Sequence, residues 1–162
     1  ILNEVENLKN LGFDKIILSG YSAGGWSSLV LQSRYPEKII GTIAFNPAFA
    51  GPKKEWQKKY PEWGAFREDS INKFKKADTI NAIVFAHKDD IFEDPKTLSF
   101  FENFKDLNLI DYSELKPTTC TYADGDKKMP SDKGHNIPQS KCFTKYLDDK
   151  NYLISFLENI LR

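Results

Sequence analysis

The chain has 162 residues, of which 40% are hydrophobic and 14% aromatic, enough to bury the core of one globular domain. Lysine plus arginine equals aspartate plus glutamate at 23 each, so net charge gives no attraction to nucleic acid or to an anionic membrane. No apolar run approaches the roughly 20 residues of a membrane span, which leaves a small, uncharged or weakly charged molecule as the expected partner.

The first part of the chain predicts helices alternating with strands. Apolar residues at helical spacing predict helices at 3–11 and 23–35, each followed by a glycine or proline that favours a stop. Continuous β-branched runs predict strands at 15–20 and 38–45, of the kind buried on both faces of a parallel sheet.

The second part continues this alternation. We expect a strand at 81–86, a helix at 93–107, a short strand at 118–122 and a last helix from about 143. Such an order predicts an α/β fold, a mostly parallel sheet with helices on both faces. Segment 46–77 is rich in proline and aromatic residues and too long for a plain connection, so it predicts a helical, lid-like insertion in a single domain of residues 1–162.

The stretch GYSAG at 20–24 matches the pattern G-x-S-x-G between a predicted strand and a predicted helix. In such a turn, Ser22 has a strained backbone and projects its hydroxyl above the sheet, and we expect side chains at Gly20 and Gly24 to collide with it. The backbone N–H of Ala23 would then point at a developing oxyanion. The alternative is a serine that only caps a helix in a tight turn.

With this motif in this context, the chain resembles the α/β-hydrolase family from the strand at 15–20 to the final helix. The resemblance implies a nucleophile at Ser22, then an acid beyond the strand that follows the insertion, then a histidine in a late loop. It also implies a serine hydrolase of the carboxylesterase type, which works through an acyl-enzyme and needs no metal or organic cofactor.

The acid has two candidates, Asp89 and Asp90, just after the strand at 81–86. We favour Asp89, because the family's spacing then places a small residue, Ala86, three positions before the acid. For the base we favour His135, which follows a glycine in a late polar loop, over His87, which lies too near its own strand to reach Ser22.

The substrate is expected to be a small-molecule ester or related acyl compound, which Tyr21, Trp56 and Trp63 would contact. The alternative for the two tryptophans is that they only pack the insertion onto the sheet. Thioesterases, peptidases and acyltransferases use the same triad, and a binding module that keeps the fold without turnover also remains open.

One departure from the family is that a single helix precedes the strand at 15–20, so no earlier loop supplies a second oxyanion donor. We therefore expect the natural protein to begin further upstream, or a partner chain to complete the sheet. Cys120 and Cys142 flank the His135 loop, and we hypothesise a disulfide between them, with two reduced cysteines as the alternative. The disulfide would imply an exported or periplasmic protein; otherwise the location stays unassigned.

Overall fold

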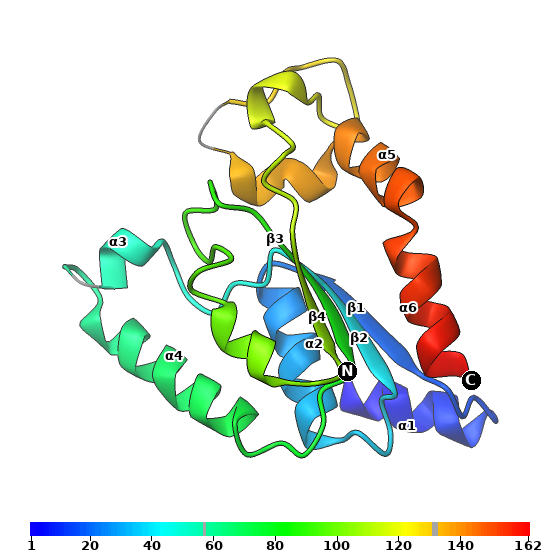
Figure 1. The fold of residues 1–162 in the computed structure, drawn as a ribbon. Coiled ribbons are helices and arrows are strands. Elements are labelled where there is room, and N and C mark those ends of the chain that lie inside the picture. The colour runs from blue at the N-terminus through cyan, green and yellow to red at the C-terminus, as the bar shows by residue number, and fades with distance from the viewer. Residues whose placement is uncertain (57, 131–132) are drawn as a thin grey trace.

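A parallel sheet forms the centre of the computed structural model, which describes residues 1–56, 58–130 and 133–162 (Figure 1). Within these residues the sheet has four strands in the order β1-β2-β3-β4: β1 (Ile17–Tyr21), β2 (Gly41–Phe45), β3 (Ala82–Ala86) and β4 (Leu107–Asp111). All neighbouring pairs are parallel, and Tyr21 lies opposite Phe45 at the end of β1. The carboxyl ends of the strands therefore share one edge, and β1 is an outer strand.

Helices cover both faces of the sheet, as the sequence predicts. One face carries α1 (Leu2–Asn10), α2 (Ala23–Arg34) and α4 (Pro61–Phe74), and the other carries α5 (Lys141–Lys150) and α6 (Tyr152–Leu161) (Figure 1). The side chains of β3 alternate between two cores: Val84 packs with α2 and α4, and Phe85 packs with α5 and α6. All five residues of β3 are buried, which explains why its sequence is apolar throughout.

The predicted insertion between β2 and β3 is helical and consists of α3 (Lys53–Trp56) and α4; residue 57 lies outside the described residues. A buried ion pair holds α4 to the segment after β3. Two guanidinium nitrogens of Arg67, Nε and Nη2, donate to the Glu93 carboxylate at 2.6 and 2.8 Å. The guanidinium also lies 5.2 Å from the ring centre of Trp56. Burial raises the pKa of Glu93, and the bonds from Arg67 oppose that rise.

The predictions for 93–107 and 118–122 are wrong. The side chains of Asp94 and Thr97 close a tight turn, which is followed by a short 3₁₀ helix, η1 (Ser99–Asn103), and then by β4. Residues 121 and 122 make isolated antiparallel bridges instead of a sheet strand.

The predicted last helix is interrupted. Asn151 adopts a left-handed φ of 56° and separates α5 from α6, so the two helices meet at a bend. Short 3₁₀ helices η2 (Pro117–Thr119) and η3 (Gly134–Gln139) precede them.

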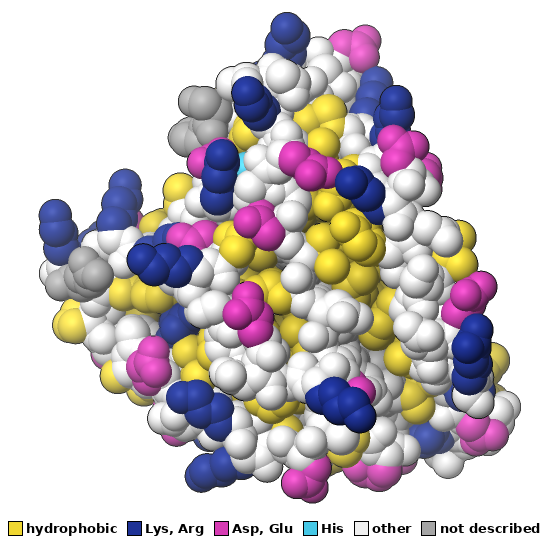
Figure 2. Space-filling model, in the orientation of Figure 1, with side chains coloured by type: hydrophobic (Ala, Val, Ile, Leu, Met, Phe, Trp, Pro, Cys, Tyr) yellow, Lys and Arg dark blue, Asp and Glu magenta, His cyan; other side chains and the backbone are white. Residues whose placement is uncertain are grey.

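The surface agrees with the balanced composition. On the face shown in Figure 2, lysine and arginine side chains are interspersed with aspartate and glutamate. Among the residues that the structure describes, no helix combines the length and the apolar character that crossing a membrane requires.

Candidate active site

Ser22 lies in the sharp turn between β1 and α2, with φ 55° and ψ −125°. Three backbone hydrogen bonds fix this conformation: the Ser22 N–H donates to Phe45 O at 3.0 Å, and the Ser22 carbonyl accepts from Ala48 N and Trp26 N at 3.1 Å each. A non-glycine residue in this region is strained and persists only where its surroundings hold it. The predicted turn is therefore present and is held by both β2 and α2.

Glycines let the end of β1 and the first turn of α2 approach each other. A Cβ at Gly20 would overlap the backbone of Gly24, and a Cβ at Gly25 would lie 2.9 Å from Gly20 O. A Cβ at Gly24 itself would meet no atom within 4 Å. A side chain at Gly20 would thus collide, as expected, although with the Gly24 backbone and not with Ser22, and the expectation for Gly24 is wrong, because the second crowded position is Gly25.

His135 lies beside Ser22, as the sequence predicts. Its Nε2 is 2.9 Å from Ser22 Oγ, and its Nδ1 is 2.7 Å from Asp90 Oδ2. His135 is 7% exposed, and the Phe92 ring lies 4.5 Å from the imidazole between centroids. A hydroxyl, an imidazole and a carboxylate in this order can pass the serine proton to Nε2 while the carboxylate stabilises the imidazolium.

The carboxylate that contacts His135 belongs to Asp90, so the preference for Asp89 is wrong. Asp90 is 2% exposed, and its Oδ1 accepts a hydrogen bond from Phe92 N at 2.8 Å. Asp89 is exposed, and its Oδ2 lies 3.9 Å from His87 Nδ1.

The reason for the shifted register is the way in which His87 is accommodated. Its ring is fully buried, with Nε2 2.7 Å from Leu115 O and with Nδ1 accepting from Asp89 N at 3.1 Å. These partners assign the Nε2–H tautomer. Space for the ring depends on Gly134, where a Cβ would lie 2.8 Å from His87 Nδ1. A bulky histidine thus occupies the position at which the sequence argument expected a small residue.

Asn46 holds the segment that carries His135, and the sequence analysis did not identify it. Its side chain is fully buried, and its Nδ2 donates to Gly134 O at 3.1 Å and to His135 O at 2.9 Å. Its Oδ1 accepts from the Tyr112 hydroxyl at 2.7 Å. Asn46 has φ 42° directly after β2. An asparagine just past a strand, where a left-handed turn is tolerated, was the available sequence signal.

Tyr21 also contacts this segment. Its hydroxyl donates to His135 O at 3.1 Å, and the two rings are 5.0 Å apart. Burial, reinforced by the nearby charge of Asp90, raises the pKa of Tyr21 to about 12. The Tyr21 hydroxyl is therefore a neutral donor throughout the ordinary pH range.

This raised pKa predicts an alkaline loss of stability. The free tyrosine value is 10.0 and the folded value is about 12, so between these pH values unfolding releases a proton. The contribution of Tyr21 is complete below pH 10 and is lost as pH rises towards 12. We expect the free energy of unfolding, measured by urea denaturation between pH 9 and 12, to fall less steeply in Tyr21→Phe than in the wild type. Parallel curves would contradict this assignment.

A groove of about 550 Å³ opens beside the serine turn, between α2 and α4. We call it the α2–α4 groove, and these residues line it: Ala23, Trp26, Ser27, Val30, Leu31, Arg34, Ala48, Phe49, Phe66, Asp69, Ser70 and Lys73.

The structure does not bring Trp56 and Trp63 to this groove. Trp56 donates its indole N–H to Gly51 O at 2.6 Å, and Trp63 stacks on Tyr60 with 4.1 Å between ring centroids. A Cβ at Gly51 would overlap the Trp63 ring. Both tryptophans therefore pack within the insertion.

Ala23 is the first residue of α2 and is exposed. The first N–H groups of a helix have no partner inside it and carry the positive end of the helix dipole. Within the described part of the chain, no acceptor takes the Ala23 N–H. It is thus available beside Ser22 for an anionic oxygen.

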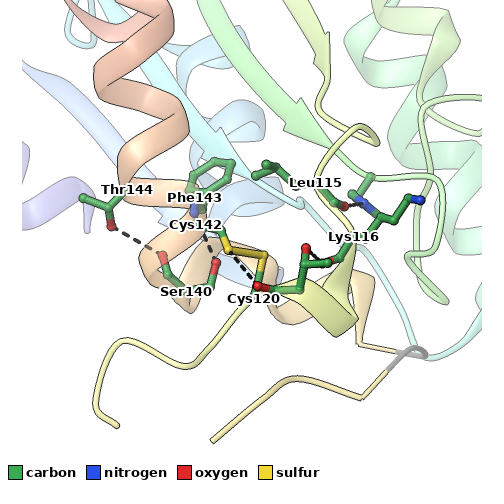
Figure 3. Close-up of a disulfide and its surroundings, with 9 residues drawn as sticks. Leu115, Lys116, Cys120, Ser140, Cys142, Phe143 and Thr144 are labelled. Carbon is green, nitrogen blue, oxygen red and sulfur yellow. Dashed lines mark hydrogen bonds between the residues drawn. A yellow bond between two sulfur atoms is a disulfide. The ribbon is translucent and has the colours of Figure 1, made fainter. Parts of the chain in front are cut away.

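A disulfide joins Cys120 to Cys142, in agreement with the hypothesis from the sequence (Figure 3). Their Cα atoms are 5.5 Å apart, and the 22-residue separation encloses His135. Figure 3 shows the bond linking the start of α5 to the segment after η2, next to Ser140, whose side chain accepts from Phe143 N at 3.2 Å. The covalent bond thus ties down the chain on both sides of the histidine segment.

Replacing both cysteines with serine is expected to lower the free energy of unfolding by about 3 kcal/mol, because a closed loop of this length restricts the unfolded chain. Urea denaturation of the double variant and the wild type, both without reductant, measures this. An unchanged midpoint and slope would show that the bond adds no stability.

Comparison with known proteins gives the fold. Neither a protein-family model nor a curated protein matches the chain. An esterase of Pyrococcus furiosus superposes with a TM-score of 0.54 at 13% identity, over 92% of this chain and 55% of that one. A Bacillus subtilis protein, provisionally described as a hydrolase, superposes with a TM-score of 0.52 at 12% identity, over 92% of this chain and 64% of that one. The chain therefore has an α/β-hydrolase-like fold, as predicted, and spans between half and two thirds of the length of these structures.

Proposed function

We propose that this chain is a serine hydrolase of carboxylic esters. The observation that carries the proposal is the continuous chain of hydrogen bonds from Ser22 Oγ through the His135 imidazole to Asp90, at 2.9 and 2.7 Å. The strained serine turn and the available Ala23 N–H support the same chemistry, because nucleophile, base and oxyanion donor then surround one reacting carbonyl.

In the proposed reaction, His135 Nε2 accepts the hydroxyl proton while Ser22 Oγ forms a bond to the ester carbonyl carbon. The carbonyl oxygen becomes an anion facing the Ala23 N–H. His135 then returns the proton to the oxygen of the leaving alcohol as the bond between that oxygen and the carbonyl carbon breaks. An acyl-enzyme remains on Ser22. Water repeats the sequence and releases the acid. Asp90 keeps the Nδ1–H tautomer and stabilises the imidazolium.

We also propose where the second oxyanion donor comes from. A strand that pairs with the outer edge of β1, from another segment or a partner chain, would bring its connecting loop next to Ser22. We also propose an oxidising location, the periplasm or the cell exterior, because a disulfide persists there.

Active-site labelling with a fluorophosphonate tests the nucleophile directly. The folded wild type is expected to incorporate one label at Ser22, located by peptide mass spectrometry, and to hydrolyse p-nitrophenyl acetate. Ser22→Ala should lose both, whereas Ser155→Ala, an exposed serine of α6, should keep both. Labelling that persists in Ser22→Ala, or a folded wild type that takes no label, would contradict the proposal and favour a binding module.

A further inference from the structure

We propose that the α2–α4 groove binds the acyl chain of the substrate, so that esters of medium-chain fatty acids are the preferred class. This inference rests on the proposed function, since it takes Ser22 as the attacking group. It goes further by assigning one side of the scissile bond to a particular surface.

The proton transfer decides which part of the ester, acyl or alcohol, lies in the groove. The leaving oxygen must lie beside His135 Nε2, which returns the proton to it, and that side of Ser22 is occupied by His135, Phe92 and Tyr21. None of these three lines the α2–α4 groove, which instead starts at Ala23 and Ala48. Ala48 donates its N–H to the Ser22 carbonyl, so the groove begins at the serine turn itself. The acyl part, which stays on Ser22, is the part that faces the groove.

Much of the groove lining between Ala23 and Leu31 is apolar. The apolar lining of the groove includes Trp26, Val30, Leu31, Phe49 and Phe66, whose side chains can contact a hydrocarbon. Trp26 is fixed as the floor, because its indole N–H donates to Ser70 Oγ of α4 at 3.0 Å. Phe66 is 60% exposed on α4, and its ring would shed water on covering an acyl chain.

Charged side chains at the far end of the groove limit the length of the acyl chain that it can hold. The apolar lining on α2 runs from Ala23 to Leu31, which is about 12 Å along a helix. Arg34 follows one turn later, and Asp69 and Lys73 face it from α4, where they form an ion pair. An extended alkyl chain advances roughly 1.3 Å per carbon from its bond lengths, so about eight to ten carbons fill the apolar part. In a longer acyl chain the terminal methyl group would lie beside these charged groups, where its contact adds no binding free energy.

The wild-type chain-length profile gives the first test. Each buried methylene is worth about a fourfold gain in kcat/KM. With p-nitrophenyl esters below their micelle concentrations, we expect kcat/KM to rise steadily from acetate to octanoate and to level off beyond about ten carbons. A flat profile, with acetate hydrolysed through Ser22, would overturn the groove assignment and leave the proposed function intact. Failure to hydrolyse any ester would overturn both.

Ser27→Phe gives the second test, because Ser27 is an exposed groove residue one turn after Ala23 and a phenyl ring there shortens the groove. The kcat/KM ratio of octanoate to acetate is expected to fall at least about tenfold. Ser155→Phe, the same change on α6 away from the groove, is the matched control and should keep the wild-type ratio. Equal ratios in both variants would overturn the proposal.

Two further measurements do not depend on Ser27→Phe folding correctly. Phe66→Ala removes an exposed ring and should lower the same ratio. Calorimetry with octanoate and acetate on Ser22→Ala should show tighter binding of octanoate without any turnover. Equal binding of the two acids would contradict an acyl site in this groove.

Discussion

Asp90→Asn is expected to lower kcat for ester hydrolysis by about 10⁴-fold, whereas Asp89→Asn should change it by no more than about twofold. The amide at position 90 keeps the shape of the carboxylate but can donate to His135 Nδ1, which reverses the tautomer and leaves Nε2 protonated and unable to accept the serine proton. It also removes the charge that stabilises the imidazolium. Asp89 is exposed and does not contact His135, so its amide changes neither property.

Steady-state kinetics with p-nitrophenyl octanoate measure both variants, and circular dichroism establishes that both are folded. The adjacent positions make each variant the control for the other. A large loss in Asp89→Asn with a small one in Asp90→Asn would return the acid role to the residue that the sequence argument favoured.

Asn46→Gly is expected to lower kcat by about 100-fold while KM changes little, because a displacement of catalytic groups by about 1 Å costs this much. Glycine adopts the positive φ of position 46 without strain, so the variant removes the amide without adding backbone strain. The bonds lost with the amide are those to Gly134 O and His135 O and the one from the Tyr112 hydroxyl. The histidine segment then loses two of the hydrogen bonds that hold it beside Ser22 and keeps the one from Tyr21. The lost bonds are also expected to reduce the free energy of unfolding by about 2–4 kcal/mol.

Tyr112→Phe is the graded control for Asn46→Gly. It removes the hydrogen bond that orients the Asn46 amide but leaves both donations to the histidine segment, so a loss of about tenfold or less is expected. The rate of fluorophosphonate labelling should fall in parallel with kcat, because both report the contact between His135 and Ser22. Full kcat in a folded Asn46→Gly would limit Asn46 to a role in stability.

The parts of the site that local sequence determines were predictable. The serine turn depends on glycines within five residues of Ser22 and on the strand and helix that flank it, and all of these are visible in one short stretch. His135 was found because the chain has only two histidines and the other one lies next to its own strand. The parallel sheet followed from three apolar runs, each of which the structure shows as a strand.

What escaped prediction depends on contacts between distant segments. The choice of Asp90 over Asp89 is decided by Gly134, which makes room for His87 from a loop more than 40 residues away. The role of Asn46 requires the end of β2, Tyr112 and the histidine segment together. β4 was missed because its sequence, LNLID, follows a stretch with helical spacing, of which only Ser99–Asn103 forms a short 3₁₀ helix.

The position of the disulfide determines how a reductant can reach it. Cys120 is completely buried beside Met129, Ile137 and Phe143, whereas the Cys142 side is partly open to water, so an incoming thiolate can attack only the Cys142 sulfur. That attack expels a negative sulfur at position 120 into an apolar pocket, which disfavours the exchange. Dithiothreitol should therefore act slowly on the folded protein, at a rate set by opening of this pocket. Activity measured minutes after its addition would still report the oxidised form.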